Sequence, residues 1–331
     1  MYNNTQLLNS SGAIDVSSAG YKIVIDTMTH IRQGVIEQKF YEIEVGDYLP
    51  IDRGTSAWSE EIVQNISFAV GGDFFEGDID TTNGNGRIAS VDAGFSKLRM
   101  PVETWGKTVS WTIMEIEKAA RAMNWDVVES KLWALRKNWL LGIQEVAFLG
   151  HPVITDMTGL LNDPDVTVNT TVINEPISDM DEGDFQNFVR EVLGAYFANS
   201  GRTRMPSKFV MPTDDYLGLG AAASATFPNV TKVDYLANFF RRMTRNENFE
   251  ILPLAYADAE ENKARGLNVN RYVLYRDDPD TLTMSIPVEF TFLAPGTSNN
   301  MQWTQPAYGQ YSGTLINRKP EVLYFDETAV S

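Results

Sequence analysis

Thiols are absent from this sequence, and histidines number only two, His30 and His151. Without cysteine there are no disulfides, thiol nucleophiles, zinc–thiolate sites or cysteine-ligated iron–sulfur clusters. Two histidines are too few for a three-histidine zinc centre, and they leave a histidine-based catalytic triad only two candidates for its base. The sequence therefore lacks the residues for several common metal centres and nucleophilic enzymes.

Basic residues are also scarce, with 27 Lys and Arg against 44 Asp and Glu, so the 331-residue chain carries a net charge of -17. Affinity for nucleic acid or for an anionic membrane comes from basic side chains, which argues against both functions. No apolar run is long enough to cross a bilayer, and the first residues lack the basic and then apolar pattern of a signal peptide. We expect a soluble chain, used in cytoplasm-like conditions, that can bury a substantial core from its 43% of hydrophobic residues.

The N-terminal region, residues 1–40, is predicted to be an arm. Residues 2–20 are rich in Asn, Ser, Thr and Gly and show no sustained periodicity. Such a segment buries too little apolar surface to order itself, so we expect it to need a surface to dock on.

Residues 41–110 favour strands and one long hairpin. Residues 41–45 alternate between apolar and acidic side chains, and residues 65–70 and 95–102 have strand-forming composition. Asn-Gly occurs twice in succession at Asn83–Gly86, which is strong turn chemistry. A two-stranded hairpin is marginal alone in water, so this one is expected to need a neighbour.

Two helices are predicted to follow. Thr112 and Glu115 have the spacing of a capping box, and Asp126 with Glu129 resembles a second start. From there apolar residues recur every three or four positions until Gly150. This second helix is about 24 residues, or about 36 Å, long.

The remaining chain is predicted to contain an α/β unit at residues 158–287 and a returning set of strands at residues 288–331. Within the first, apolar residues of 185–196 form one helical face, and Lys208–Met211 and Arg271–Tyr275 are strand-like. The overall fold class is α+β.

Motifs for chemistry are weak throughout. The glycines of Gly218-Leu219-Gly220 fall inside a helical pattern and lack the strand–turn–helix context of a dinucleotide site. Asp277, Asp278 and Asp280 flank Pro279 as in an ordinary turn, although paired carboxylates of a glycosidase stay an open alternative. The sequence predicts no catalytic residue, no cofactor and no metal. A carbohydrate platform is one alternative use of the tryptophans at 105, 111, 125, 133 and 139.

The order of these parts resembles the major capsid proteins of tailed bacteriophages with the Hong Kong 97 fold. Three stretches carry the likeness, namely Ser110–Gly150, Gly159–Pro164, and the C-terminal end with Gln305–Gly309 and Arg318–Val322. The resemblance implies an N-terminal arm (1–40), peripheral strands with an extended hairpin loop (41–110), a spine helix (111–157), an α/β axial domain (158–287) and returning peripheral strands (288–331).

The resemblance also implies a function. The chain would be a structural subunit, not an enzyme, that self-assembles into pentamers and hexamers of an icosahedral capsid around double-stranded DNA, without sequence-specific binding. Portal, scaffolding or decoration proteins would be further partners, no membrane would be involved, and the virion would assemble in the host cytoplasm. Encapsulin compartments share the fold and remain an alternative, and a carbohydrate-active enzyme or binding module is a second one.

Candidate contacts between subunits follow from the hairpin and the spine helix. At the tip and base of the hairpin they are Asp80, Asn83, Gly84, Asn85, Gly86, Arg87 and Trp105. On the face of the spine helix they are Leu132, Leu135, Trp139 and Ile143.

Overall fold

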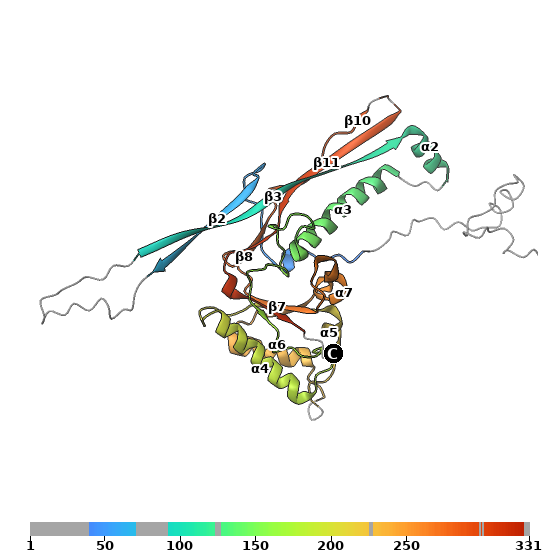
Figure 1. Cartoon of the computed structure of the whole chain (residues 1–331). Helices are drawn as coiled ribbons and strands as arrows, with labels where there is room; N and C mark the ends of the chain where they lie inside the picture. Colours follow the sequence, from blue (N-terminus) through green and yellow to red (C-terminus); the bar gives the residue numbers. More distant parts are fainter. Residues whose placement is uncertain are drawn as a thin grey trace, which may run out of the picture. The chain divides into compact units, whose positions relative to one another are not determined.

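The computed structural model describes residues 40–70, 92–122, 127–224, 228–297, 299 and 301–327 (Figure 1). The chain divides into a small unit, Met1–Tyr41 with Ile113–Val127, and a large unit, Glu42–Thr112 with Val128–Ser331. The small unit contains helix α2 (Ile113–Ala122), which begins directly after Thr112, as the sequence predicts.

The first sheet is built around one very long strand. In spatial order it contains β10 (Gly296–Thr297), β11 (Gln302–Ser312), β3 (Asp92–Thr112) and β2 (Glu61–Val70), and β9 (Val288–Phe292) also pairs with β11. The 21 residues of β3 span about 70 Å. Its first half pairs with β2 and its second half with β11, both antiparallel. The predicted hairpin strands are thus confirmed, and one of them continues into the body of the subunit.

Helix α3 (Val127–Leu149) is the predicted long helix. It ends at Gly150, whose φ of +70° is accessible to glycine at little cost. A Cβ on Gly150 would lie 2.5 Å from the carbonyl oxygen of Met157. The chain therefore reverses tightly here, and a larger residue does not fit.

A second sheet forms the α/β part. Its order is β4 (Val168–Asn169), β13 (Val322–Asp326), β7 (Arg271–Tyr275), β5 (Lys208–Met211) and β6 (Glu250–Pro253). The helices of this part are α4 (Glu182–Asn199), α5 (Thr213–Gly218), α6 (Lys232–Thr244) and α7 (Ala259–Asn262). Side chains of α4 and α6 share one buried cluster with the sheet, so both helices cover the same face of it (Figure 1).

A small third sheet joins the other two. It consists of β1 (Ile51–Asp52), β8 (Leu282–Ser285) and β12 (Thr314–Ile316). The larger buried cluster contains Trp139 of α3, Met284 of β8 and Tyr324 of β13, so one core runs between α3 and the α/β sheet. No helix within the described ranges is long and apolar enough to cross a membrane.

One predicted strand is wrong, and one grouping of strands differs from the sheets. Residues 41–45 form no strand, because the chain turns into a 3-10 helix at Val45–Asp47 that allows Tyr48 and Leu49 to be buried. Strand β13, predicted among the returning peripheral strands, pairs with β7 and β4 of the α/β sheet. The predicted domain boundaries stay a prediction.

Candidate assembly surfaces

The β2–β3 hairpin is a ladder with little of the subunit beneath it. Ten residue pairs join the strands, from Glu61↔Pro101 to Val70↔Asp92. Among the ladder side chains whose burial is described, only that of Met100 is buried. Strand β2 is also an edge of its sheet, so one row of its backbone groups has no strand partner in the described part of the chain. A ladder of this kind gains stability when another surface covers it.

Apolar side chains stand in solvent on one face of this ladder. Phe95 is 77% exposed and lies opposite Ser67. Val63 is 43% exposed on the same face, since residues of like parity in a strand share a face. These side chains are suited to contact a partner. The predicted tip residues Asp80, Asn83, Gly84, Asn85, Gly86 and Arg87 lie outside the described residues.

The contact face predicted on the spine helix is mostly buried within the subunit. Leu135, Trp139 and Ile143 are 5–7% exposed and pack inside their own chain, and a role of this face between subunits stays a prediction. Leu132 is half-buried. Trp105, at the hairpin base, has its ring centroid 5.2 Å from that of Trp139. The stripe of apolar residues packs on the sheet of its own chain. The sequence could not distinguish this from a subunit interface, because both produce the same periodicity of apolar residues.

An exposed tryptophan that sequence reasoning missed lies on the other face of this sheet. Trp58 is 61% exposed and has φ +64°, a conformation rarely adopted by bulky residues. Its ring stacks on Tyr308 at 5.7 Å, and its backbone N–H donates to Gln310 Oε1 at 2.7 Å. Tyr308 pairs with Gly106, the neighbour of the α3-facing Trp105, and therefore faces away from α3. No local sequence pattern predicts this backbone conformation, because the hydrogen bond of the Trp58 N–H is accepted by Gln310, which is distant in the sequence.

Two of the grooves in the large unit differ in the chemistry of their walls. One of about 610 Å³ lies between α3 and β9 and is lined by apolar side chains such as Leu140 and Phe292, beside the Arg53–Glu289 ion pair. The other, about 580 Å³, is mostly polar and is lined by residues of β2, β1 and the loops around Asp280 and Asn317. No group of three or more His, Cys, Asp or Glu residues in the described ranges is arranged to hold a metal ion.

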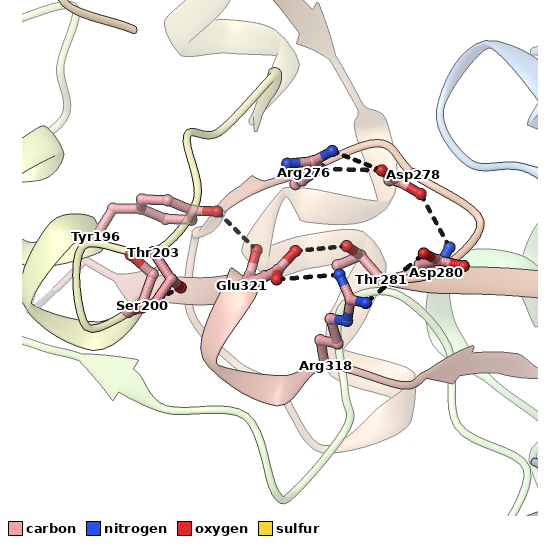
Figure 2. A network of polar contacts seen from close by, with 9 residues as sticks. All are labelled: Tyr196, Ser200, Thr203, Arg276, Asp278, Asp280, Thr281, Arg318 and Glu321. Atoms are coloured by element: carbon pink, nitrogen blue, oxygen red, sulfur yellow. Dashed lines mark hydrogen bonds and ion pairs between the residues drawn. The ribbon is translucent and has the colours of Figure 1, made fainter. Parts of the chain in front are cut away.

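A polar network fixes the end of the α/β sheet where β7 ends and β13 begins (Figure 2). Glu321 is its centre: one carboxylate oxygen accepts from Thr281 Oγ1 at 2.6 Å, and its backbone carbonyl accepts from the Tyr196 hydroxyl at 3.1 Å. Burial, and then the negative charge of Glu321, raise the pKa of Tyr196 well above its ordinary value. Tyr196 therefore stays a neutral donor that ties α4 to the strand.

Ion pairs complete this network and satisfy its basic side chains. Arg276 donates to Asp278 at 2.7 Å, and Arg318 lies 3.5 Å from Glu321 and 3.6 Å from Asp280. The pKa of Asp278 is lowered chiefly by a hydrogen bond from the Asp280 backbone, which outweighs the opposing effect of burial, and Arg276 lowers it further. The predicted turn at Asp277–Asp280 is thus a structural one, with no free pair of carboxylates at hand for acid–base chemistry.

The opposite end of the sheet collects carboxylates. Burial, followed by the charge of Asp214, raises the pKa of Asp258 to about 6, against a hydrogen bond from the Thr213 backbone that lowers it. Asp215 is buried and accepts hydrogen bonds from Tyr272 and, at 3.0 Å, from Ser178 Oγ. Asp258 lines neither of the two grooves described above, so its raised pKa, caused first by burial and then by neighbouring carboxylates such as Asp214, lies apart from both of them.

The architecture of a long hairpin, a spine helix and an α/β unit is that of shell-forming phage capsid proteins. The capsid of Myoviridae phage XM1 superposes with a TM-score of 0.75 at 13% identity, over 91% of this chain and 97% of that chain. A structure titled Mycobacterium phage Ogopogo gives 0.58 at 11% identity, over 92% and 98%. The capsid of a native GTA particle gives 0.55 at 10% identity, over 97% and 100%. The fold is thus the Hong Kong 97 fold.

The family follows from the sequence match. The model of the major capsid protein family matches residues 81–327, well over half of the chain, and the chain belongs to that family. It is a structural capsid subunit that assembles with copies of itself into a shell. Comparison with curated proteins finds no match. These findings confirm the predicted resemblance and fold class, and they favour the capsid function over the encapsulin and carbohydrate alternatives.

Proposed function

We propose that the chain forms pentamers and hexamers that close into an icosahedral capsid around double-stranded DNA, with no catalytic role. The exposed β2–β3 ladder carries this proposal. A subunit in a ring makes heterologous contacts, in which one surface meets a different surface of the next copy. The hairpin, with Phe95 exposed at 77%, is suited to be one of those surfaces.

The charge of the chain supports enclosure of DNA without affinity for it. A net charge of -17 makes a subunit repel the phosphate backbone. In such a shell the DNA is retained by enclosure and not by binding to the subunits. Assembly in the host cytoplasm, and further partners such as portal, scaffolding or decoration proteins, belong to the same proposal.

Electron microscopy of the purified chain tests it. The wild-type protein is expected to form closed particles or five- and six-fold capsomers. A variant in which Asn-Gly replaces residues 67–95 keeps the pair Ile66↔Ser96 as the last rung of a short hairpin. We expect this variant to stay folded, because nearly all of its core is untouched, and to form no particles.

A point variant refines the test. Phe95→Ser removes the exposed ring and is expected to raise the protein concentration needed for particles at an unchanged unfolding midpoint. Val153→Ser, a matched change at a loop residue that is 80% exposed, is the control and is expected to assemble as wild type does. A monomeric wild-type chain under all assembly conditions, or normal particles from the hairpin-deleted variant, would contradict the proposal.

A further inference from the structure

The two ends of the α/β sheet can be distinguished by register. Lys208 of β5 lies opposite Glu250 of β6 and Tyr275 of β7, which defines the first end. Asn199, the last residue of α4, donates at 3.3 Å to the carbonyl of Val322. Val322 in turn pairs with Tyr275. Helix α6 leads directly into β6. Both helices therefore finish at the first end.

The same helices begin together at the second end. The Lys232 ammonium group in the first turn of α6 donates to the carbonyls of Ser178 at 3.0 Å and Met180 at 2.8 Å, just before α4. Asp215 of α5 accepts from Ser178 as well. The 18 residues of α4 separate the two ends by about 27 Å.

Exposed arginines gather at the first end. We call the following set the arginine end: Arg202, Arg204, Arg241, Arg242 and Arg245. None of them forms an ion pair with another residue in the described part of the chain, whereas Arg276 and Arg318 nearby are paired within the network of Figure 2. Met205 and Met243 are 44% and 53% exposed among them. Arginine and methionine are the residues that protein interfaces favour over ordinary surface.

Two of these arginines occupy positions that glycine would fill with less strain. Arg202 has φ +62° and Arg245, the C-cap of α6, has φ +53°. They are two of the three non-glycine residues with positive φ in the described ranges, the third being Trp58. The left-handed residue after a helix is usually glycine because it has no Cβ. A bulky residue at such a strained position is a reason to look for a use of its side chain.

Exposed carboxylates gather at the second end. We call the following set the carboxylate end: Asp179, Asp181, Glu182, Asp184, Asp214 and Asp234. All lie in or next to the first turns of α4, α5 and α6. Burial is the main cause of the raised pKa values of Asp258 and Glu327, and the charges of Asp214 and Asp179 add to it at this end of the sheet.

We propose that the arginine end of one copy docks on the carboxylate end of the next copy, head to tail, so that these contacts help to close the ring. The inference rests on the proposed function and names the surfaces that meet. A heterologous ring needs two different, mutually complementary surfaces on one subunit, and here they lie at opposite ends of the same helices. Guanidinium groups match carboxylates with paired hydrogen bonds, which adds geometric specificity to the attraction.

Two other uses of these charges have to be separated from docking. Acids at helix starts and bases at helix ends also stabilise the helices through their dipoles. An arginine surface also suits a polyanion such as duplex DNA, although the net charge of -17 opposes that use. The test must therefore measure folding, assembly and DNA binding in the same variants.

The first variant is Arg202→Gly with Arg245→Gly. Glycine relieves the backbone strain at both positions, so the unfolding midpoint is expected to stay level or to rise. Ring and shell formation, followed by analytical ultracentrifugation and electron microscopy, is expected to need at least a tenfold higher protein concentration. Raising NaCl from about 0.05 M to about 0.5 M is expected to weaken assembly of the wild type more than that of this variant.

The second variant exchanges charges. Arg241→Glu with Arg242→Glu is expected to block rings, and adding Glu182→Arg with Asp184→Arg in the same chain is expected to restore them. Arg190→Glu changes an exposed charge in the middle of α4 and is the control, expected to assemble normally. Rescue by the four-fold exchange supports docking, because a dipole effect on the helices would only worsen.

Several outcomes overturn the inference. It fails if the glycine variant assembles at wild-type concentrations, or if the four-fold exchange does not rescue rings while its unfolding midpoint stays normal. It also fails if the arginine variants assemble normally and instead lose binding to a duplex DNA fragment. If the hairpin deletion blocks particles while all arginine variants form them, the proposed function stands and only this inference falls.

Discussion

Replacing Gly309 by alanine perturbs the contact that joins the spine helix to the peripheral sheet. An added Cβ would lie 2.5 Å from Cη2 and 2.9 Å from Cζ3 of the Trp139 ring. That ring has little room to move, because its centroid is 5.2 Å from that of Trp105, 6.1 Å from Phe290 and 5.9 Å from Tyr311. The clash must therefore displace the helix or the strand.

The size of the effect follows from two opposing contributions. Overpacking a dense core costs about 1–3 kcal/mol. Alanine in a strand recovers about 0.5–1 kcal/mol relative to glycine, since it loses less backbone entropy on folding. We therefore expect Gly309→Ala to lower the free energy of unfolding by about 1–2 kcal/mol.

Urea unfolding of the unassembled subunit, followed by tryptophan fluorescence, measures this difference. Gly296→Ala is the matched control: its Cβ would meet nothing within 4 Å, so no loss is expected. Combining Gly309→Ala with Trp139→Phe removes the clashing ring atoms. The double variant is expected to be more stable than the sum of the single changes by about 1 kcal/mol. Strict additivity, or an unaffected Gly309→Ala subunit, would refute the packing argument.

Three further predictions concern single groups of the large unit. Arg271→Met leaves the Asp326 carboxylate, only 14% exposed, without its 2.6 Å partner and should cost about 3 kcal/mol. Arg271→Met with Asp326→Leu should recover most of this loss in denaturant titrations. Because the folded pKa of Asp258 is raised to about 6 from 3.8, the protonated form is favoured in the folded state, so stability falls as pH rises from about 4 to about 6 and is level above. Solvent screening of this half-exposed group limits the change in unfolding free energy to about 1 kcal/mol. Asp258→Asn should remove this pH dependence, measured by thermal unfolding at several pH values. An unchanged pH dependence in the variant would contradict the assignment. Gly150→Ala forces a Cβ to 2.5 Å from the Met157 carbonyl at φ +70° and should lower the unfolding free energy by about 2 kcal/mol or more, checked by the same urea titration.

The elements that could be predicted from sequence are those whose signals are local. Helix α3 was predicted by a stripe of apolar residues and a terminal glycine, and Gly150 ends it as expected. Strands β5 and β7 were predicted at their observed bounds, because both are short apolar runs between polar turns. In contrast, the alternation of residues 41–45 favoured a strand that has no partner strand, and the chain there makes a helical turn instead.

The candidate contact residues were harder to predict, since their role depends on distant parts of the chain. A stripe that contains Trp139 looks the same whether it faces a sheet of its own chain or another subunit. The conformation of Trp58 depends on the Gln310 side chain, 252 positions away. The arginine end contains two loops, one with Arg202 before β5 and one with Arg245 before β6. These loops are neighbours because β5 and β6 pair in parallel, which the sequence does not reveal.

Core and surface thus have separate effects on assembly, and this separation makes the predictions decisive. The subunit has two buried clusters and buried ion pairs of its own, so we expect it to fold without a partner, whereas the β2–β3 ladder does not bury its side chains until another surface covers it. A core change such as Gly309→Ala lowers the population of folded subunits, and it weakens assembly only through mass action. A surface change such as Phe95→Ser leaves the folded population intact and weakens the contact itself. Plotting the concentration needed for assembly against the unfolding midpoint should therefore place the two kinds of variant on different lines, and a single line for both would mean that folding and assembly are one process.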